Sequence, residues 1–184
     1  GSEQIISALF GYGSFDKVSV VNSGKALYYF AFGLPAFSLI KVFSTFFFAN
    51  HDTKTPFYIS LISVLTNILI SIYYFGQVGF IIIPIATTIS SWFNALLLFL
   101  FLKNKGLFYF NNIFIVRFIK ILAASLLMGI LFNFLITYFQ EELAFNQNIK
   151  SFYLILCVVL SLLFYLFVSY IIRAFKMSEI KLKY

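Results

Sequence analysis

The chain has little of what most enzymes and metalloproteins need. Its 184 residues include one histidine, His51, one cysteine, Cys157, and six acidic side chains. A disulfide within the chain is therefore excluded, and Cys157, which lies in an apolar run, is expected to be a small buried hydrophobic residue. There is no second histidine for a metal site or a triad, no glycine-rich phosphate loop, and no carboxylate inside an apolar run. We therefore predict no catalytic residue, no cofactor and no metal, and do not expect an enzyme.

Hydrophobic residues, in contrast, are abundant. They make up 62% of the chain, aromatic residues make up 22% and charged residues only 10%, and the mean hydropathy is +0.99. Soluble domains are roughly 45–50% apolar, so the composition indicates an integral membrane protein with membrane lipid as a partner. The net charge of +7 would suggest nucleic acid in a soluble protein. Here membrane topology explains the charge better, and no nucleic-acid partner is expected.

Five apolar stretches are long enough to cross a bilayer, which takes about 20 residues of α-helix. They are residues 26–48, 57–75, 80–102, 118–139 and 152–172. Turn residues or charges separate them, and inside the bilayer they must be helical because every backbone polar group needs an internal partner. The sequence therefore predicts an all-α membrane protein with five transmembrane helices.

Lysine and arginine residues are divided unevenly between the two sides that these spans define. The richer side, with the connections at 50–56 and 103–117 and the tail at 173–184, holds Lys54, Lys103, Lys105, Arg117, Lys120, Arg173, Lys176, Lys181 and Lys183. The other side holds only Lys17, Lys25 and Lys150. Because cytoplasmic loops carry the excess of positive charge, we predict a cytoplasmic C-terminus and an extracytoplasmic interfacial segment at residues 1–25. A chain that starts outside without a signal peptide leads us to expect further N-terminal helices of the same protein.

Lys41 is an ionisable residue inside a predicted span, which makes it a functional candidate by default. It lies about 10 Å of helix from Phe48, at 1.5 Å per residue, so its ammonium group can extend to the cytoplasmic headgroups. Two interpretations stay open: a lysine that reaches the headgroups or pairs structurally, and a cavity-facing contact to an anionic substrate.

Three asparagines and two prolines also interrupt the apolar spans. Asn67, Asn94 and Asn133 lie near the middle of three different spans, where an amide seeks a partner on another helix. Interhelical hydrogen bonding and contact with a substrate path are both compatible with these positions. Pro35 and Pro84 can kink their helices and free backbone carbonyls. In transporters such breaks often line cavities, but packing alone would also tolerate them.

The polar stretch FFFANHDTKTPFYIS, residues 46–60, joins the first two spans. Its ionisable side chains could form a reactive cluster or a water-exposed turn. Thr55 followed by Pro56 is typical of a helix start, with threonine as the N-cap and proline at the first helical position. Asp52 is a turn former. These features favour a cytoplasmic turn whose composition serves structure.

The last two spans, residues 118–139 and 152–172, are bulky and apolar nearly all round. Such helices are expected to face lipid or a lipid-like ligand. Ordinary membrane lipid and a bound lipid substrate are both compatible with this pattern.

Five stretches can be compared with known sequence motifs: residues 9–16, 39–43, 48–56, 83–88 and 92–96. The most specific of them is 48–56, FANHDTKTP. Taken together, these stretches resemble the MurJ/MviN family, the lipid II flippases of bacterial peptidoglycan synthesis. The likeness covers nearly the whole chain and corresponds to the last five of the family's fourteen helices. At Gly11 and Tyr12 the chain departs from the family's usual acidic–basic pair, and His51 stands at a variable position.

This resemblance implies a transporter fold of the multidrug/oligosaccharidyl-lipid/polysaccharide exporter type, working by alternating access. Residues 26–102 would complete its C-terminal lobe, and residues 118–172 would be two additional helices that form a groove for the polyprenyl tail. The implied partner is a polyprenyl-linked lipid substrate, with Lys41 as the candidate contact for its diphosphate–sugar headgroup. The implied location is the bacterial inner membrane, and the implied role is in cell-wall biogenesis and cell shape.

Two alternatives stay open beside this interpretation. One is an exporter of another polyprenyl-linked saccharide or of a drug in the same superfamily, and the other is a non-transporting membrane scaffold. Flipping of lipid II by the full-length protein would distinguish a lipid II flippase from the first alternative. A scaffold, in contrast, would tolerate neutral substitutions in the cavity and retain partner binding.

Overall fold

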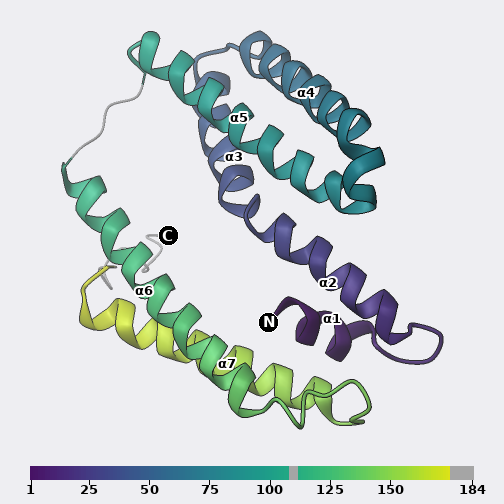
Figure 1. Cartoon of the computed structure of the whole chain (residues 1–184). Coiled ribbons are helices and arrows are strands. Elements are labelled where there is room, and N and C mark those ends of the chain that lie inside the picture. The colour runs from purple at the N-terminus through teal and green to yellow at the C-terminus, as the bar shows by residue number, and fades with distance from the viewer. Residues whose placement is uncertain (108–111, 175–184) are drawn as a thin grey trace. The chain divides into compact units, whose positions relative to one another are not determined.

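Figure 1 shows a computed structural model of the chain, which describes residues 1–107 and 112–174. Its elements, in chain order, are α1 (Ser2–Phe10), α2 (Lys17–Ala31), α3 (Leu34–Ala49), α4 (Lys54–Val78), the 3₁₀-helix η1 (Gly79–Ile81), α5 (Ile82–Asn104), α6 (Asn112–Tyr138) and α7 (Lys150–Ile171). The described residues form helices and turns and include no strand. The predicted all-α fold is therefore confirmed.

Four helical stretches among the described residues are long and apolar enough to cross a membrane: Lys17–Ala49, Lys54–Asn104, Asn112–Tyr138 and Lys150–Ile171. The second stretch has 51 residues and folds back on itself as a hairpin of α4 and α5 (Figure 1). Since α4 has 25 residues and α5 has 23, each has the roughly 20 residues that one crossing needs. The structure thus has the helices of a multi-pass membrane protein.

The chain divides into two compact units, residues 22–109 and residues 1–21 with 110–184. In the first, α3 and α4 both pack against α5 (Figure 1). The small side chains Ala86, Ser90 and Ala95 of α5 are buried, which allows the close helix approach typical of membrane bundles. At the end of the bundle near the α3–α4 connection, a core forms from Phe43, Phe47, Ile59, Leu98 and Leu102.

The second unit consists of α6 packed along α7, with the short helix α1 against α7 (Figure 1). Its buried core contains Ala8, Ile136, Leu143 and Leu154. The turn after α1 depends on Gly11, because a Cβ atom there would lie only 2.6 Å from the carbonyl oxygen of Ser7. Packing against α7 therefore holds the short helix α1.

The first predicted span differs most from the structure. In place of one helix over residues 26–48, the chain forms α2 and α3, with a break at Phe32 and Gly33. Pro35 accounts for the break, because it has no N–H to bond the carbonyl of Ala31 and its ring crowds that carbonyl. The kink predicted at Pro35 is confirmed.

The other spans differ from prediction mainly at their ends. The helix α4 extends three residues beyond each end of 57–75, and α6 already begins inside the predicted connection 103–117. Pro84 lies in the first turn of α5, where a missing N–H leaves no helical bond unmade. The prediction of a kink at Pro84 is therefore wrong. Most of the predicted tail at 173–184 lies outside the described residues.

Candidate functional site

Lys41 lies on a polar face of α3. Ser38, Lys41 and Thr45 are all exposed, and their spacing of three and four residues places them on one side of the helix. The buried side chains of Phe43 and Phe47 belong to the core that α3 forms with α5, and at 100° per residue they lie roughly opposite Lys41. In residues 22–109, Lys41 thus faces away from the packed interface.

The polar groups on this face differ in how they are satisfied. The hydroxyls of Ser38 and Thr45 donate to carbonyls of their own helix, at 3.1 and 2.6 Å. Among the described residues, no carboxylate pairs with Lys41. A polar face on an otherwise apolar membrane helix favours contact with protein or water over hydrocarbon. The arrangement leaves the ammonium group as the group with binding capacity.

The break between α2 and α3 is bridged by two side chains of α5. The Oγ1 of Thr88 donates to the carbonyl of Tyr29 at 2.8 Å, and the Nε1 of Trp92 donates to the carbonyl of Phe32 at 2.9 Å. Neither hydrogen bond is predicted by the sequence. The available signal was Trp92 itself, because an indole N–H within an apolar span needs an acceptor.

The polar stretch between α3 and α4 is a structural turn rather than a reactive cluster. His51 adopts a left-handed conformation with φ of 56°, and the N–H groups of His51 and Asp52 donate to Phe48 and Phe47 carbonyls, both at 3.0 Å. This pattern is the Schellman motif that closes helix C-termini. It explains why a residue tolerant of positive φ stands at this position.

Asp52 caps the start of the next helix, α4. Its Oδ1 accepts the N–H of Thr55 at 3.0 Å, and its Oδ2 accepts the Thr55 hydroxyl at 2.7 Å. The helix α4 starts at Lys54, two residues before the predicted first helical residue, Pro56. The predicted start is therefore wrong by two positions, and Asp52 supplies the cap in place of Thr55. The carboxylate caps the helix because it satisfies an N–H that has no partner within it.

Lys105, the residue that follows α5, contacts this turn. Its Nζ lies 2.5 Å from Oδ2 of Asp52 and 5.6 Å from the ring centre of Phe47. The hydrogen bond from Lys105, followed by those from Thr55, holds the pKa of the Asp52 carboxyl well below its usual range. Asp52 therefore joins the start of α4 to the residue that follows α5.

Of the three asparagines, Asn67 has the clearest role. Its Nδ2 donates to Thr87 at 3.1 Å and to Ser90 at 3.3 Å, both on α5. The interhelical hydrogen bonding expected of Asn67 is confirmed. Asn94 is buried, and its Oδ1 has no partner among the described residues. Asn133 is exposed on α6, and its side chain makes no hydrogen bond to another helix in the part of the chain that the structure describes.

A buried lysine, Lys150, lies where α1 meets α7. Lys150 is only 1% exposed, and its Nζ donates to the carbonyls of Gly11 and Phe145, both at 2.7 Å. The ammonium also lies 4.3 Å from the ring centre of Tyr12. Tyr12, where the chain departs from the acidic–basic pair of the family, supplies an aromatic face to the lysine. The sequence predicts Lys150 in the connection between the last two spans, and no local pattern predicts its burial.

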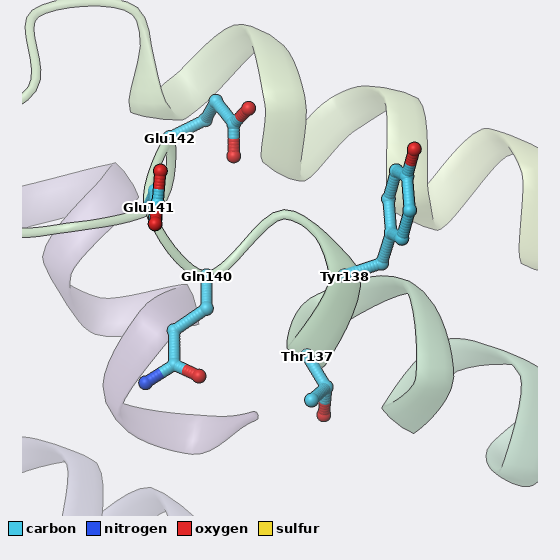
Figure 2. A pocket seen from close by; sticks show the side chains of 5 residues that line it. All are labelled: Thr137, Tyr138, Gln140, Glu141 and Glu142. Carbon is cyan, nitrogen blue, oxygen red and sulfur yellow. The ribbon is translucent and has the colours of Figure 1, made fainter.

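An open pocket of about 530 Å³ lies at the loop after α6, lined by Thr137, Tyr138, Gln140, Glu141 and Glu142. Figure 2 shows the two glutamates on the loop and the threonine and tyrosine at the end of α6. The pocket belongs to a different unit from Lys41, and it has no cationic lining residue for an anionic headgroup. In residues 1–107 and 112–174, no group of three potential metal ligands occurs.

Comparison with known proteins gives a consistent result. A family model described as "Lipid II flippase MurJ" matches residues 1–154. The chain is 41% identical over 105 residues to a "Probable lipid II flippase MurJ" of Rhizobium meliloti, which covers 57% of the chain and 20% of the relative. The protein of that name from Rickettsia prowazekii is 31% identical, covering 77% of the chain and 28% of the relative. That from Rhizobium tropici is 29% identical, covering 98% and 34%.

The helices, the apolar surfaces and the polar face on α3 define a multi-pass, all-helical membrane protein. The family model matches well over half of the chain. The chain belongs to the lipid II flippase MurJ family, whose members are transporters by name. It spans about a fifth to a third of the length of the curated relatives named above.

Proposed function

We propose that the chain is the C-terminal part of a bacterial lipid II flippase. The whole protein would move the undecaprenyl-diphosphate-linked peptidoglycan precursor across the inner membrane by alternating access. The observation that carries this proposal is the family match over residues 1–154, together with the four apolar helical stretches that are long enough to cross a membrane among the described residues. The transport step is a change of binding site exposure, so no covalent chemistry is assigned to this chain.

In this proposal the polyprenyl tail lies against α6 and α7. The two helices pack together through small or moderate side chains, including Ala124, Cys157 and Ser161, which are buried. Their outer faces carry large exposed apolar residues such as Ile130 and Phe167. A surface of this kind is compatible with a long hydrocarbon chain, which gains dispersion contacts with bulky apolar side chains.

The headgroup contact assigned to this chain is Lys41. A diphosphate is dianionic or more, and a lysine ammonium is a compact charge with three donors that binds phosphate well. The face of α3 that carries Lys41 points away from α5 and has polar neighbours in Ser38 and Thr45. These features support a cavity-facing lysine in the complete transporter.

The proposed orientation places the C-terminus and the α3–α4 turn in the cytoplasm. The Asp52–Lys105 pair brings the start of α4 and the end of α5 together. Lys54, Lys103 and Lys105 therefore lie at one end of the helix bundle of residues 22–109, as Figure 1 shows for the helix ends. Positive charge gathered at one end supports a cytoplasmic position for that end.

The proposal is tested with the full-length protein in proteoliposomes that contain fluorescent lipid II. Wild type is expected to expose lipid II on the opposite leaflet, Lys41→Ala to slow this severalfold, and Lys41→Arg to retain most activity because the charge remains. Lys25→Ala, a change at an exposed lysine of α2, is the matched control and should transport normally. Wild-type transport with no loss in Lys41→Ala would remove the headgroup role of Lys41.

The same assay addresses the alternatives. Transport of another polyprenyl-linked saccharide or of a drug, with no transport of lipid II, would show a different exporter of the superfamily. Absence of any transport by wild type, with retained binding of partner proteins, would indicate a membrane scaffold.

A further inference from the structure

The break between α2 and α3 frees two backbone carbonyls that a continuous helix would use. In an uninterrupted α-helix, the carbonyl of Tyr29 accepts the N–H of Gly33, and the carbonyl of Phe32 accepts that of Ala36. Here the N–H of Gly33 donates to Phe30 instead, at 2.9 Å. The carbonyls of Tyr29 and Phe32 accept hydrogen bonds from α5.

The two donors on α5 are placed together. Thr88 and Trp92 are four residues apart and so lie on one face of the helix, and they reach the carbonyls of Tyr29 and Phe32 at 2.8 and 2.9 Å. We call this pair of hydrogen bonds the α5 latch. It holds one carbonyl in the last turn of α2 and one at the break itself, so that it fixes the relative direction of α2 and α3.

Gly33 makes the close approach possible. A Cβ atom at this position would lie 3.1 Å from Oγ1 of Thr88, which is tighter than an ordinary contact. The helix that carries the latch is itself anchored, because Asn67 of α4 donates to Thr87 and Ser90 on either side of Thr88. The break is therefore held against a fixed helix rather than against a mobile side chain.

We propose that Thr88 and Trp92 are positioning residues that hold the α2–α3 break in its bent form and thereby set the direction of the face that carries Lys41. Each latched carbonyl has two alternative donors, a side chain of α5 in the bent form and a backbone N–H of its own helix in a straighter form. The carbonyls of Tyr29 and Phe32 are therefore paired in both forms, as hydrocarbon requires, whereas the carbonyl of Ala31 has no N–H donor at Pro35 in a straight helix. The break is thus a two-state element, and its effect on Lys41 rests on the proposed function.

The latch is tested by distance measurement in the full-length protein in lipid nanodiscs. Spin labels at Lys25→Cys in α2 and Val42→Cys in α3, with Cys157→Ala and any other native cysteines replaced, would be about 26 Å apart in one straight helix. The variant Thr88→Val with Trp92→Phe removes both donors; valine keeps the shape of threonine, and phenylalanine keeps an aromatic ring of smaller size. Because the variant removes two hydrogen bonds between membrane helices, we expect the bent-to-straight equilibrium to shift roughly eightfold toward the straight form.

Three further variants make this result specific. Thr88→Ser keeps the hydroxyl and should retain the wild-type distance distribution. Thr66→Val removes a hydroxyl that bonds only within its own helix, at 2.9 Å, and should also leave the distribution unchanged. Pro35→Ala restores the missing N–H and should shift the distances even with the latch intact. An unchanged distribution in the double variant, or an equal change in Thr66→Val, would overturn the latch.

Transport separates the latch from the proposed function. If both hold, the double variant slows lipid II flipping together with the distance shift, whereas Lys41→Ala slows flipping without any shift. A distance shift in a protein whose wild type does not flip lipid II would support the latch and refute the proposed function. Wild-type flipping rates in the double variant, despite a distance shift, would overturn the positioning role of Thr88 and Trp92.

Discussion

Replacement of Lys150 by methionine tests the contacts of the buried ammonium group that joins α1 to α7. Methionine fills a similar volume but removes two hydrogen bonds, to Gly11 and Phe145, and the contact with the Tyr12 ring. Each buried carbonyl left unpaired costs about 1–3 kcal/mol, and each lost ring contact about 0.5–1 kcal/mol. Part of this loss is offset because the variant no longer buries a charge.

The net effect expected for Lys150→Met is a loss of about 3 kcal/mol from the packing of α1 on α7. At about 1.4 kcal/mol per factor of ten, this raises the population with α1 detached about 100-fold. The effect should be local, because α6 and α7 keep their own interface and α1 is a helix of nine residues.

Hydrogen–deuterium exchange of the full-length protein in nanodiscs measures this directly. The amides of Ser2–Phe10 should exchange about 100-fold faster in Lys150→Met, while those in the middle of α6 and α7 remain protected. Lys25→Met removes an exposed lysine and should leave exchange in α1 unchanged. Unaltered protection of α1 in Lys150→Met would refute the inference that the buried ammonium holds this helix.

Three other substitutions probe the remaining contacts by thermal unfolding of the full-length protein. Asn67→Leu should lose about 1–2 kcal/mol through its bonds to α5, whereas Asn133→Leu, on an exposed face, should be close to neutral; equal losses would contradict the bridging role. Phe47→Ala removes a fully buried ring and should cost about 3 kcal/mol, far more than Phe48→Ala at an exposed position, and a reversed order would contradict the core assignment. Because bonding lowers the pKa of Asp52, its stabilisation is complete above the unfolded value of about 3.9 and is lost as the pH falls below it. Asp52→Asn should therefore flatten the acid side of the curve of melting temperature against pH, and an unchanged acid side would refute the bonding.

The sequence predicted best those features that depend on short stretches of chain. The five apolar stretches became helices because a backbone in hydrocarbon has no other way to satisfy its polar groups. Pro35 broke the first of them because its ring and missing N–H act within one turn. Interhelical bonding was one of the two roles left open for Asn67, and the structure shows it, with Nδ2 3.1 and 3.3 Å from two residues of α5.

Errors in the sequence-based predictions arose where helix ends depend on capping. The first helical residue of α4 was predicted to be Pro56, with Thr55 as the N-cap, but the carboxylate of Asp52 supplies the cap and the helix begins at Lys54. The first span was placed at 26–48, whereas α2 begins at Lys17, where Oδ1 of Asp16 accepts the N–H of Ser19 at 2.8 Å. A hydropathy pattern finds the apolar middle of a helix and does not register the polar side chains that extend it.

By itself, the sequence determined that this protein is a helical, multi-pass membrane protein, and its motifs indicated the family. Only the tertiary structure decided which polar groups meet: Lys150 with the end of α1, Lys105 with Asp52, and Trp92 with the carbonyl freed near Pro35. These partners are separated by 53 to 139 residues in the chain. Local patterns encode where helices form, but the pairing of distant residues depends on the register in which the helices pack, and that register is fixed by the fit of side chains across the whole bundle.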